Sequence, residues 1–143
     1  MTATKAPSLA QRRLTLPTVP ASVPLARREA RKLLADWLTE ADEALADAAL
    51  LALSELVTNS VRHAAITSPL ADVLLALTPE VLIIAVHDRH PAIPAPRSRA
   101  HADGGGGRGL AIVAALAEEA GGELRVVADA DALGKTSTVR LPR

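Results

Sequence analysis

The 143-residue sequence predicts an α+β fold, a two-layer sandwich with helices packed on one face of a mixed, mainly antiparallel β-sheet. Apolar patterns follow the order β-α-α-β-β-α-β-β along the chain. Hydrophobic residues make up 49% of the chain and aromatic residues only 1%, so aliphatic side chains must build the core. Two strongly apolar runs stand only a short turn apart, which is typical of an antiparallel hairpin.

The N-terminal part of the chain is expected to supply one strand and one helix. Residues 1–11 are small and polar, so we expect a flexible leader before a single domain over residues 12–143. Residues 13–17 alternate apolar and polar and end at a proline, which predicts a short edge strand. In residues 25–38, apolar residues recur at helical spacing with Arg and Lys between them, which predicts an amphipathic helix.

The rest of the chain is expected to supply two helices and four strands. Residues 43–65 are apolar along one side, which predicts the second helix, and the third begins at residues 110–113 and ends near Gly121 and Gly122. The strands are expected at residues 72–77, 81–86, 123–128 and 136–141.

The segment between the predicted strand at residues 81–86 and the third predicted helix is unusually long. Residues 87–107 contain several prolines, a cluster of arginines and four consecutive glycines, so no regular element is expected there. A loop of about twenty residues within a compact domain is usually functional. We therefore expect a lid over about residues 89–108.

Charge and composition limit the classes of partner. Sixteen basic and sixteen acidic residues cancel, so no overall field draws the chain to nucleic acid or to an anionic membrane. The absence of cysteine fits a reducing compartment. We see neither the apolar core of a signal peptide nor an uninterrupted apolar run of about 18 residues. A soluble cytoplasmic protein is expected.

Polar residues form a stripe along the second predicted helix. Glu55, Asn59, Arg62 and His63 fall at i, i+4, i+7 and i+8, which aligns them opposite the Leu and Val side. A carboxylate, a neutral oxygen ligand and two cationic groups thus stand in a row. The solvated face of an ordinary amphipathic helix would have the same pattern, so the stripe alone leaves both interpretations open.

The glycine run at residues 104–109 leads directly into a helix, where free N–H groups and the helix dipole favour a phosphate. A flexible linker is the alternative. The run matches the dinucleotide-binding pattern, but no strand precedes it. Residues 134–136, Gly-Lys-Thr, imitate the end of a P-loop, yet Asp129 stands where that motif needs glycine. A dinucleotide-binding fold is therefore disfavoured, and a P-loop is rejected.

A different pattern remains. It comprises Glu-x-x-x-Asn on a helix, Asp at a strand end, a long lid, Gly-x-Gly-Leu opening a helix and Gly-x-Thr opening the last strand. It resembles the Bergerat-fold ATP-binding domains of gyrase, heat-shock chaperones, histidine kinases and mismatch-repair proteins, and most of all the small anti-sigma-factor serine kinases. The resemblance extends over residues 13–141 and is carried by SELVTNSVRHA (54–64), VHDRHPAIP (86–94), GRGLAIV (107–113) and GKTSTVRLP (134–142).

The resemblance implies roles for the residues of the stripe and the glycine run. Asn59 would bind Mg²⁺, whose other ligands would be phosphate oxygens and water. Glu55 would be the general base that takes the proton from a serine hydroxyl of a partner protein. Charge on the transferring phosphoryl group would be neutralised by Arg62, His63 and Arg108. The nucleotide would also contact Gly105, Gly107, Gly109 and Leu110.

The resemblance places the adenine ring of ATP at the end of a predicted strand. Asp88 would accept a hydrogen bond from the adenine amino group, at a position where guanine presents a carbonyl. Thr136 would lie beside Asp88 and help to orient the adenine. The sequence departs from the family here. Most members have Asp-x-Gly-x-Gly, whereas residues 88–92 read Asp-Arg-His-Pro-Ala and lack both glycines. This change alters the backbone path around the adenine and can weaken nucleotide affinity.

Two functions remain as hypotheses. The first is an ATP- and Mg²⁺-binding anti-sigma factor with serine/threonine kinase activity toward an anti-sigma antagonist, which the presence of Glu55 favours. The alternative is a non-catalytic module that binds ATP as a structural ligand and sequesters a sigma factor or another regulator. A detached histidine-kinase catalytic domain ranks last, because no helix pair with a phosphoacceptor histidine precedes the domain. A homodimer is left open.

Overall fold

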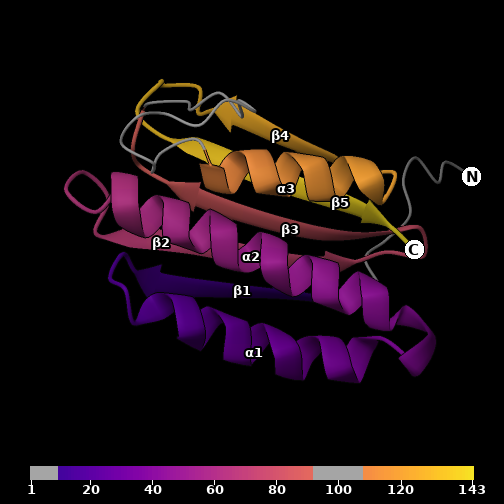
Figure 1. Cartoon of the computed structure of the whole chain (residues 1–143). Helices are drawn as coiled ribbons and strands as arrows, with labels where there is room; N and C mark the ends of the chain where they lie inside the picture. Colours follow the sequence, from indigo (N-terminus) through magenta and orange to yellow (C-terminus); the bar gives the residue numbers. More distant parts are fainter. Residues whose placement is uncertain (1–9, 92–107) are drawn as a thin grey trace, which may run out of the picture.

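The computed structural model describes residues 10–91 and 108–143 (Figure 1). Residues 1–9, in the expected leader, and most of the expected lid lie outside the described part. Along the chain the elements are β1 (Ala10–Pro17), α1 (Ser22–Trp37), the 3-10 turn η1 (Glu40–Asp42), α2 (Glu43–His63), β2 (Leu70–Leu77), β3 (Val81–Asp88), α3 (Arg108–Glu119), β4 (Glu123–Ala128) and β5 (Lys135–Pro142). The predicted α+β order is confirmed.

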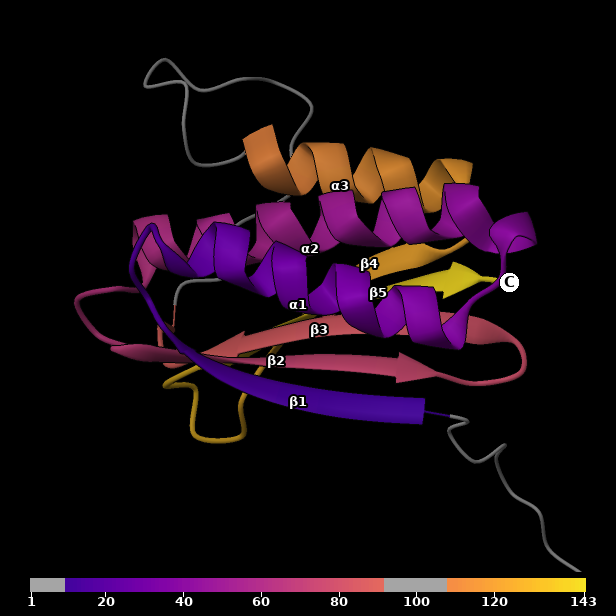
Figure 2. The same cartoon turned by 90° about the horizontal axis from the view of Figure 1, so that it is seen from below.

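The strands form one sheet in the order β1-β2-β3-β5-β4, and every pair among the described strands is antiparallel, so the expected parallel component is absent from them. Helices α1, α2 and α3 lie side by side over one face of this sheet (Figure 1). The view from below shows the helices as one layer and the sheet as the other (Figure 2). The predicted two-layer sandwich is therefore confirmed.

Aliphatic side chains fill the space between the layers, as the near absence of aromatic residues predicts. Leu53 of α2, Ile84 of β3 and Val139 of β5 are fully buried, and burial of each such side chain contributes about 1.5–3 kcal/mol. Because side chains alternate along a strand, the inward direction of Ile84 also turns the side chain of Asp88 toward the helices, and Asp88 is buried.

Five elements begin one to three residues earlier than the sequence predicts, and the shift is largest for β1 and α1. β1 begins at Ala10, so residues 10 and 11, which we expected in the leader, belong to the sheet. The pairing with β2 continues from Pro17 opposite Leu70 to Ala10 opposite Leu77, beyond the alternating stretch that the sequence reveals. α1 begins at Ser22, whose hydroxyl donates to the carbonyl oxygen of Pro17 at 2.6 Å.

Two connections depend on particular residues. In the β2–β3 turn, the hydroxyl oxygen of Thr78 accepts hydrogen bonds from the backbone N–H groups of Glu80 and Val81, at 3.2 and 3.0 Å. Between α3 and β4, Gly121 has a φ of 85°, in the left-handed region that favours glycine. A Cβ at Gly122 would collide with the carbonyl oxygen of Arg140. The close approach of α3 to the sheet edge therefore requires this glycine pair.

Helix α2 occupies the middle of the helical layer. Together with η1 it spans Glu40–His63 and is long and apolar enough to cross a membrane by length and composition alone. However, half of its apolar window is buried inside the molecule, and α2 contacts α1, α3, β3 and β5. This packing accounts for the apolar composition of the helix.

Candidate functional site

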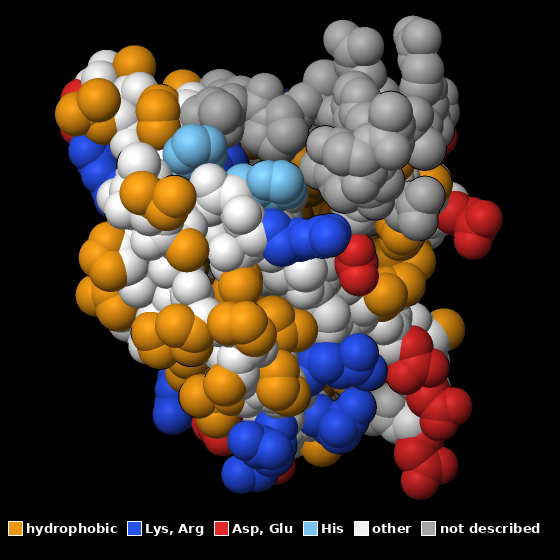
Figure 3. All heavy atoms as spheres, turned by 60° about the vertical axis from the view of Figure 1, so that its left-hand side comes forward, with side chains coloured by type: hydrophobic (Ala, Val, Ile, Leu, Met, Phe, Trp, Pro, Cys, Tyr) orange, Lys and Arg blue, Asp and Glu red, His pale blue; other side chains and the backbone are white. Residues whose placement is uncertain are grey.

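Most of the sequence-predicted site residues lie on elements that meet at one end of the molecule. There the C-terminal half of α2 and the last residue of β3 approach the first turn of α3 and the first residues of β5, at the left-hand end of Figure 1. Figure 3 brings this end forward and shows histidine and Lys or Arg side chains gathered above a broad area of hydrophobic side chains. Motifs that are far apart in the sequence are therefore close together in the fold.

Asp88, the last residue of β3, is the centre of a buried hydrogen-bond cluster. Its side chain is only 3% exposed. The hydroxyl of Ser60 on α2 donates to Oδ2 at 2.7 Å, and the backbone N–H of His90 donates to Oδ1 at 3.0 Å. Oδ1 also accepts a hydrogen bond from the ammonium group of Lys135, at 2.8 Å. One carboxylate thus joins α2, the end of β3 and the start of β5.

Two members of this cluster, Ser60 and Lys135, were not predicted from the sequence. Lys135 is the first residue of β5 and pairs directly with Asp88 in the sheet register. Its side chain is 2% exposed, and Nζ also donates to the carbonyl oxygen of His90 at 3.3 Å. A buried ammonium group is tolerated only when it is paired with an opposite charge and hydrogen-bonded. Asp88 and His90 provide both.

The structure corrects the expected position of Thr136. In the pairing of β3 with β5, Thr136 lies opposite His87, one residue away from Asp88. Its side chain lies on the helix-free face of the sheet, where Thr136, His87 and Asp72 line a shallow hollow of about 470 Å³. Because successive strand residues point to opposite faces, Lys135 takes the place beside Asp88 that we expected for Thr136.

Asn59 and Glu55 lie one helical turn apart on α2. Asn59 is 8% exposed, and none of the described residues hydrogen-bonds to its side chain. Glu55 is half-buried and lies against the first turn of α3, where a Cβ built on Gly109 would be 2.8 Å from Oε1 of Glu55. Leu110 is fully buried and anchors this turn of α3 in the core. The first N–H groups of a helix lack partners within the helix, so α3 offers donors next to the α2 stripe.

Two of the remaining predicted residues lie at the edge of this site. Arg62 and His63 are exposed on the last turn of α2, where positive charge is favoured by the helix dipole. Gly105, Gly107 and the side chain of Arg108 lie outside the described residues, as does most of the expected lid.

The start of the expected lid is held by the turn between β4 and β5. Nη1 and Nη2 of Arg89 donate to Asp129 and Asp131, at 2.9 and 3.0 Å. The pKa of Asp131 is lowered by a hydrogen bond from the backbone N–H of Leu133 and then by Arg89, and Asp131 in turn raises the pKa of Arg89. His87 also contacts Asp129, with Nε2 at 2.8 Å from the carboxylate. The β4–β5 turn therefore holds the side chains of the two residues that flank Asp88, His87 and Arg89.

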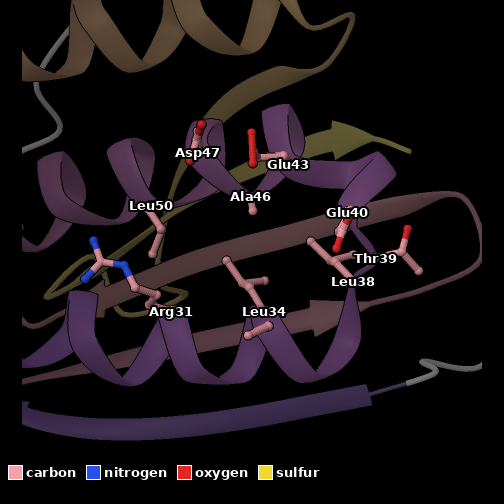
Figure 4. A pocket seen from close by; sticks show the side chains of 10 residues that line it. Arg31, Leu34, Leu38, Thr39, Glu40, Glu43, Ala46, Asp47 and Leu50 are labelled. Atoms are coloured by element: carbon pink, nitrogen blue, oxygen red, sulfur yellow. The ribbon is translucent and has the colours of Figure 1, made fainter.

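A separate hollow of about 430 Å³ lies between α1 and the N-terminal half of α2 (Figure 4). Arg31 and Leu34 of α1 line it, together with Glu43 and Asp47 of α2. None of the predicted site residues is among its lining residues, so the hollow is distinct from the cluster around Asp88.

Comparison with known proteins gives one family model and a number of similar solved structures. A family model described as a histidine kinase-like ATPase domain matches residues 16–136. The crystal structure of the RsbU and RsbW domains of Rv1364c from Mycobacterium tuberculosis matches with a TM-score of 0.66 at 23% identity, over 94% of this chain and 33% of that chain. A histidine kinase domain from a blue-light activated kinase of Erythrobacter litoralis matches with a TM-score of 0.48 at 27% identity, over 68% and 44%. The chain thus spans a third of the mycobacterial chain, and a search of curated sequences finds no significant match.

Proposed function

Because this chain belongs to the histidine kinase-like ATPase domain family, we propose that it binds ATP with Mg²⁺ where α2, β3 and α3 meet and phosphorylates a serine or threonine of a partner protein. One observation carries the proposal. Glu55 lies against the first turn of α3, Asn59 follows it one helical turn along α2, and the neighbouring Ser60 is hydrogen-bonded to Asp88 at 2.7 Å. A carboxylate, an amide and a second carboxylate thus lie on α2 and at the end of β3, and the proposal gives them the roles of general base, Mg²⁺ ligand and adenine acceptor.

The described residues are compatible with a magnesium ion that is shared with a triphosphate. Among them, no group of three or more His, Cys, Asp or Glu side chains could hold a metal by itself. Mg²⁺ commonly takes one or two protein oxygens and completes its octahedron with phosphate oxygens and water. The amide oxygen of Asn59 fits this role, because no described residue uses it. ATP with Mg²⁺ would supply the phosphoryl group that is transferred.

Glu55 would act on the acceptor. Residues four apart on a helix have Cβ atoms about 5–6 Å apart, so Glu55 would stand next to a hydroxyl that approaches the phosphate bound to the Mg²⁺ on Asn59. The carboxylate would accept the hydroxyl proton as the oxygen attacks the γ-phosphorus, whose bond to the β–γ bridging oxygen breaks so that ADP leaves. The exposed Arg62 and His63 would add positive charge at the same end of α2.

The proposed partners are proteins. The motifs resemble those of small anti-sigma-factor kinases, so the proposed roles are to hold a sigma factor and to phosphorylate an anti-sigma antagonist, in the cytoplasm. The balanced charge of sixteen basic and sixteen acidic residues gives no support to nucleic acid as the direct partner.

A second candidate is a module that holds its partner without transferring phosphate. It is favoured by the ion pair between Lys135 and Asp88, at 2.8 Å, which engages the carboxylate proposed to read adenine. The sequence Asp-Arg-His-Pro-Ala at residues 88–92, which lacks the two family glycines, favours it as well.

Calorimetric titration with ATP, with and without Mg²⁺, tests the proposal. The parent protein should bind ATP in a Mg²⁺-dependent manner, and Asn59→Ala should lose this binding while its circular dichroism spectrum stays unchanged. Glu55→Gln should bind as the parent does but form ADP more slowly, whereas Glu43→Gln, an exposed change at the other end of α2, should alter neither property. Absence of ATP binding by the folded parent would overturn the proposal. Because a kinase without its acceptor protein need not form ADP, the second candidate would be selected by ATP binding with no ADP formed when the anti-sigma antagonist is present.

A further inference from the structure

The ammonium group of Lys135 and the amino group of adenine are both hydrogen-bond donors, and both are directed to Asp88. The proposed function assigns Asp88 to adenine, yet in the structure Lys135 donates to Oδ1 of Asp88 at 2.8 Å. The two side chains are 2% and 3% exposed, so this pair lies within the protein rather than at its surface.

We propose that Lys135 is an internal competitor of the nucleotide base. Its ammonium group takes the donor position of the adenine amino group on Asp88, and ATP binds fully only when Lys135 leaves that carboxylate. This inference rests on the proposed ATP site and adds a residue that sets its affinity and base selectivity.

The hydrogen bonds of Asp88 support competition rather than simultaneous binding. An ionised carboxylate has about four lone-pair positions. In Asp88, Oδ1 accepts from Lys135 and from the backbone N–H of His90, and Oδ2 accepts from the hydroxyl of Ser60. The remaining position is on the oxygen that Ser60 contacts, and Ser60 is itself only 2% exposed. A base that reaches Asp88 therefore finds three of its acceptor positions already occupied, two of them on the oxygen that Lys135 contacts.

Charge gives a second reason. Hydrogen bonds to an ionised acceptor are about twice as strong as those between neutral groups. The ammonium group of Lys135 neutralises the carboxylate of Asp88, so the carboxylate attracts an adenine amino group less strongly while the pair persists. Lys135 can leave, because its ammonium group sits on a flexible four-carbon stem. Its departure breaks a buried ion pair, however, and that cost lowers the affinity for ATP.

Replacement of Lys135 by a neutral residue of similar length tests the inference. Lys135→Met should bind ATP at least tenfold more tightly than the parent in calorimetry, which corresponds to about 1.4 kcal/mol. Lys32→Met removes an exposed lysine on α1 and should leave the affinity unchanged. Equal affinities of Lys135→Met and the parent would overturn the inference and leave the ATP site standing. Failure of both proteins to bind ATP would overturn the proposed function as well.

A measurement on the parent protein covers the case in which Lys135→Met does not fold. The chain has only three lysines, so acylation by an amine-reactive reagent can be followed at each by mass spectrometry. Without nucleotide, Lys135 should be protected relative to the exposed Lys32, and saturating ATP should raise its labelling at least tenfold. Unchanged labelling at an ATP concentration that saturates the protein would contradict the inference.

Comparison with GTP adds a third outcome. If the ammonium group of Lys135 blocks the base, the parent should discriminate weakly between ATP and GTP, and Lys135→Met should prefer ATP. A parent preference for GTP that disappears in Lys135→Met would overturn the inference, because the ammonium group would then donate to the guanine carbonyl instead of excluding the base.

Discussion

Replacement of Asp88 by asparagine should lower the free energy of unfolding by about 3–5 kcal/mol, because it removes one partner of a buried ion pair. In Asp88→Asn the amide oxygen can still accept one hydrogen bond, and the carbonyl oxygen of His90 still lies 3.3 Å from Nζ of Lys135. No negative charge remains against the ammonium group, which is 2% exposed and reaches water only by moving out of its site.

The thermal consequence of this loss follows from the size of the chain. For domains near 150 residues, a change of 1 kcal/mol at the melting temperature shifts Tm by about 3 °C. Asp88→Asn should therefore melt roughly 10–15 °C below the parent. Because the hydroxyl of Ser60 donates to the carboxylate at 2.7 Å, part of the loss arises from this weakened contact.

A double-mutant cycle separates the ion pair from the other contacts. Urea unfolding of the parent, Asp88→Asn, Lys135→Met and the double variant would be followed by circular dichroism and by the fluorescence of Trp37. The double variant should recover part of the loss, because a neutral pair leaves no uncompensated buried charge. Asp36→Asn, at an exposed position of α1, should change stability by less than about 0.5 kcal/mol. A loss below about 1 kcal/mol in Asp88→Asn, or strictly additive effects in the cycle, would refute the buried pair.

Three further substitutions address α3, the edge of the sheet and the core. Gly109→Ala places a Cβ 2.8 Å from Oε1 of Glu55, so Glu55 must turn away; ADP formation should fall at least tenfold while Tm changes by only a few degrees. Gly122→Ala drives a methyl group into the carbonyl oxygen of Arg140 and should cost at least about 2 kcal/mol in urea unfolding, because backbone must move. Leu53→Ala opens a cavity at a fully buried position of α2 and should cost about 2–5 kcal/mol in the same assay.

The sequence was sufficient for the layer architecture because its apolar patterns are strong. The runs that became β2 and β3 are apolar on both sides of a short turn, and this pattern specifies a central hairpin even in a single sequence. The start of β1 was not predicted, because no strong apolar pattern is present there. Residues 10–13 read Ala-Gln-Arg-Arg, and an edge strand with one exposed side does not need apolar residues there to pair with β2.

The site was predictable where it depends on one element and not where it depends on contacts between elements. The spacing of Glu55 and Asn59 on α2 follows from helical geometry, and Asp88 follows from the end of an apolar strand. Ser60 and Lys135 contact Asp88 across sequence separations of 28 and 47 residues, which local patterns do not report. A lysine is also among the residues least often buried, so the residue type did not predict that the side chain of Lys135 is buried.

The error at Thr136 has a simple geometric origin. Side chains alternate between the two faces of a strand, so a shift of one residue exchanges the faces. From the motif Gly-Lys-Thr we predicted that the threonine lies beside Asp88. In the structure Lys135 pairs with Asp88, so the side chain of Lys135 faces the helices. The inward alternation of Val139 and Ser137 on β5 leads back to Lys135, and this was the signal that the sequence offered.

The two halves of the proposed site differ in how ready they are for a ligand. At the phosphate end, the side chain of Asn59 has no hydrogen-bond partner among the described residues, and Gly109 keeps the first turn of α3 close to Glu55. At the base end, three donors already occupy the carboxylate of Asp88. A nucleotide would therefore gain most of its binding free energy from the triphosphate and Mg²⁺, and its base would add selectivity only after the ion pair opens. On this proposal, the charge on Lys135 would decide whether this end of the fold recognises adenine.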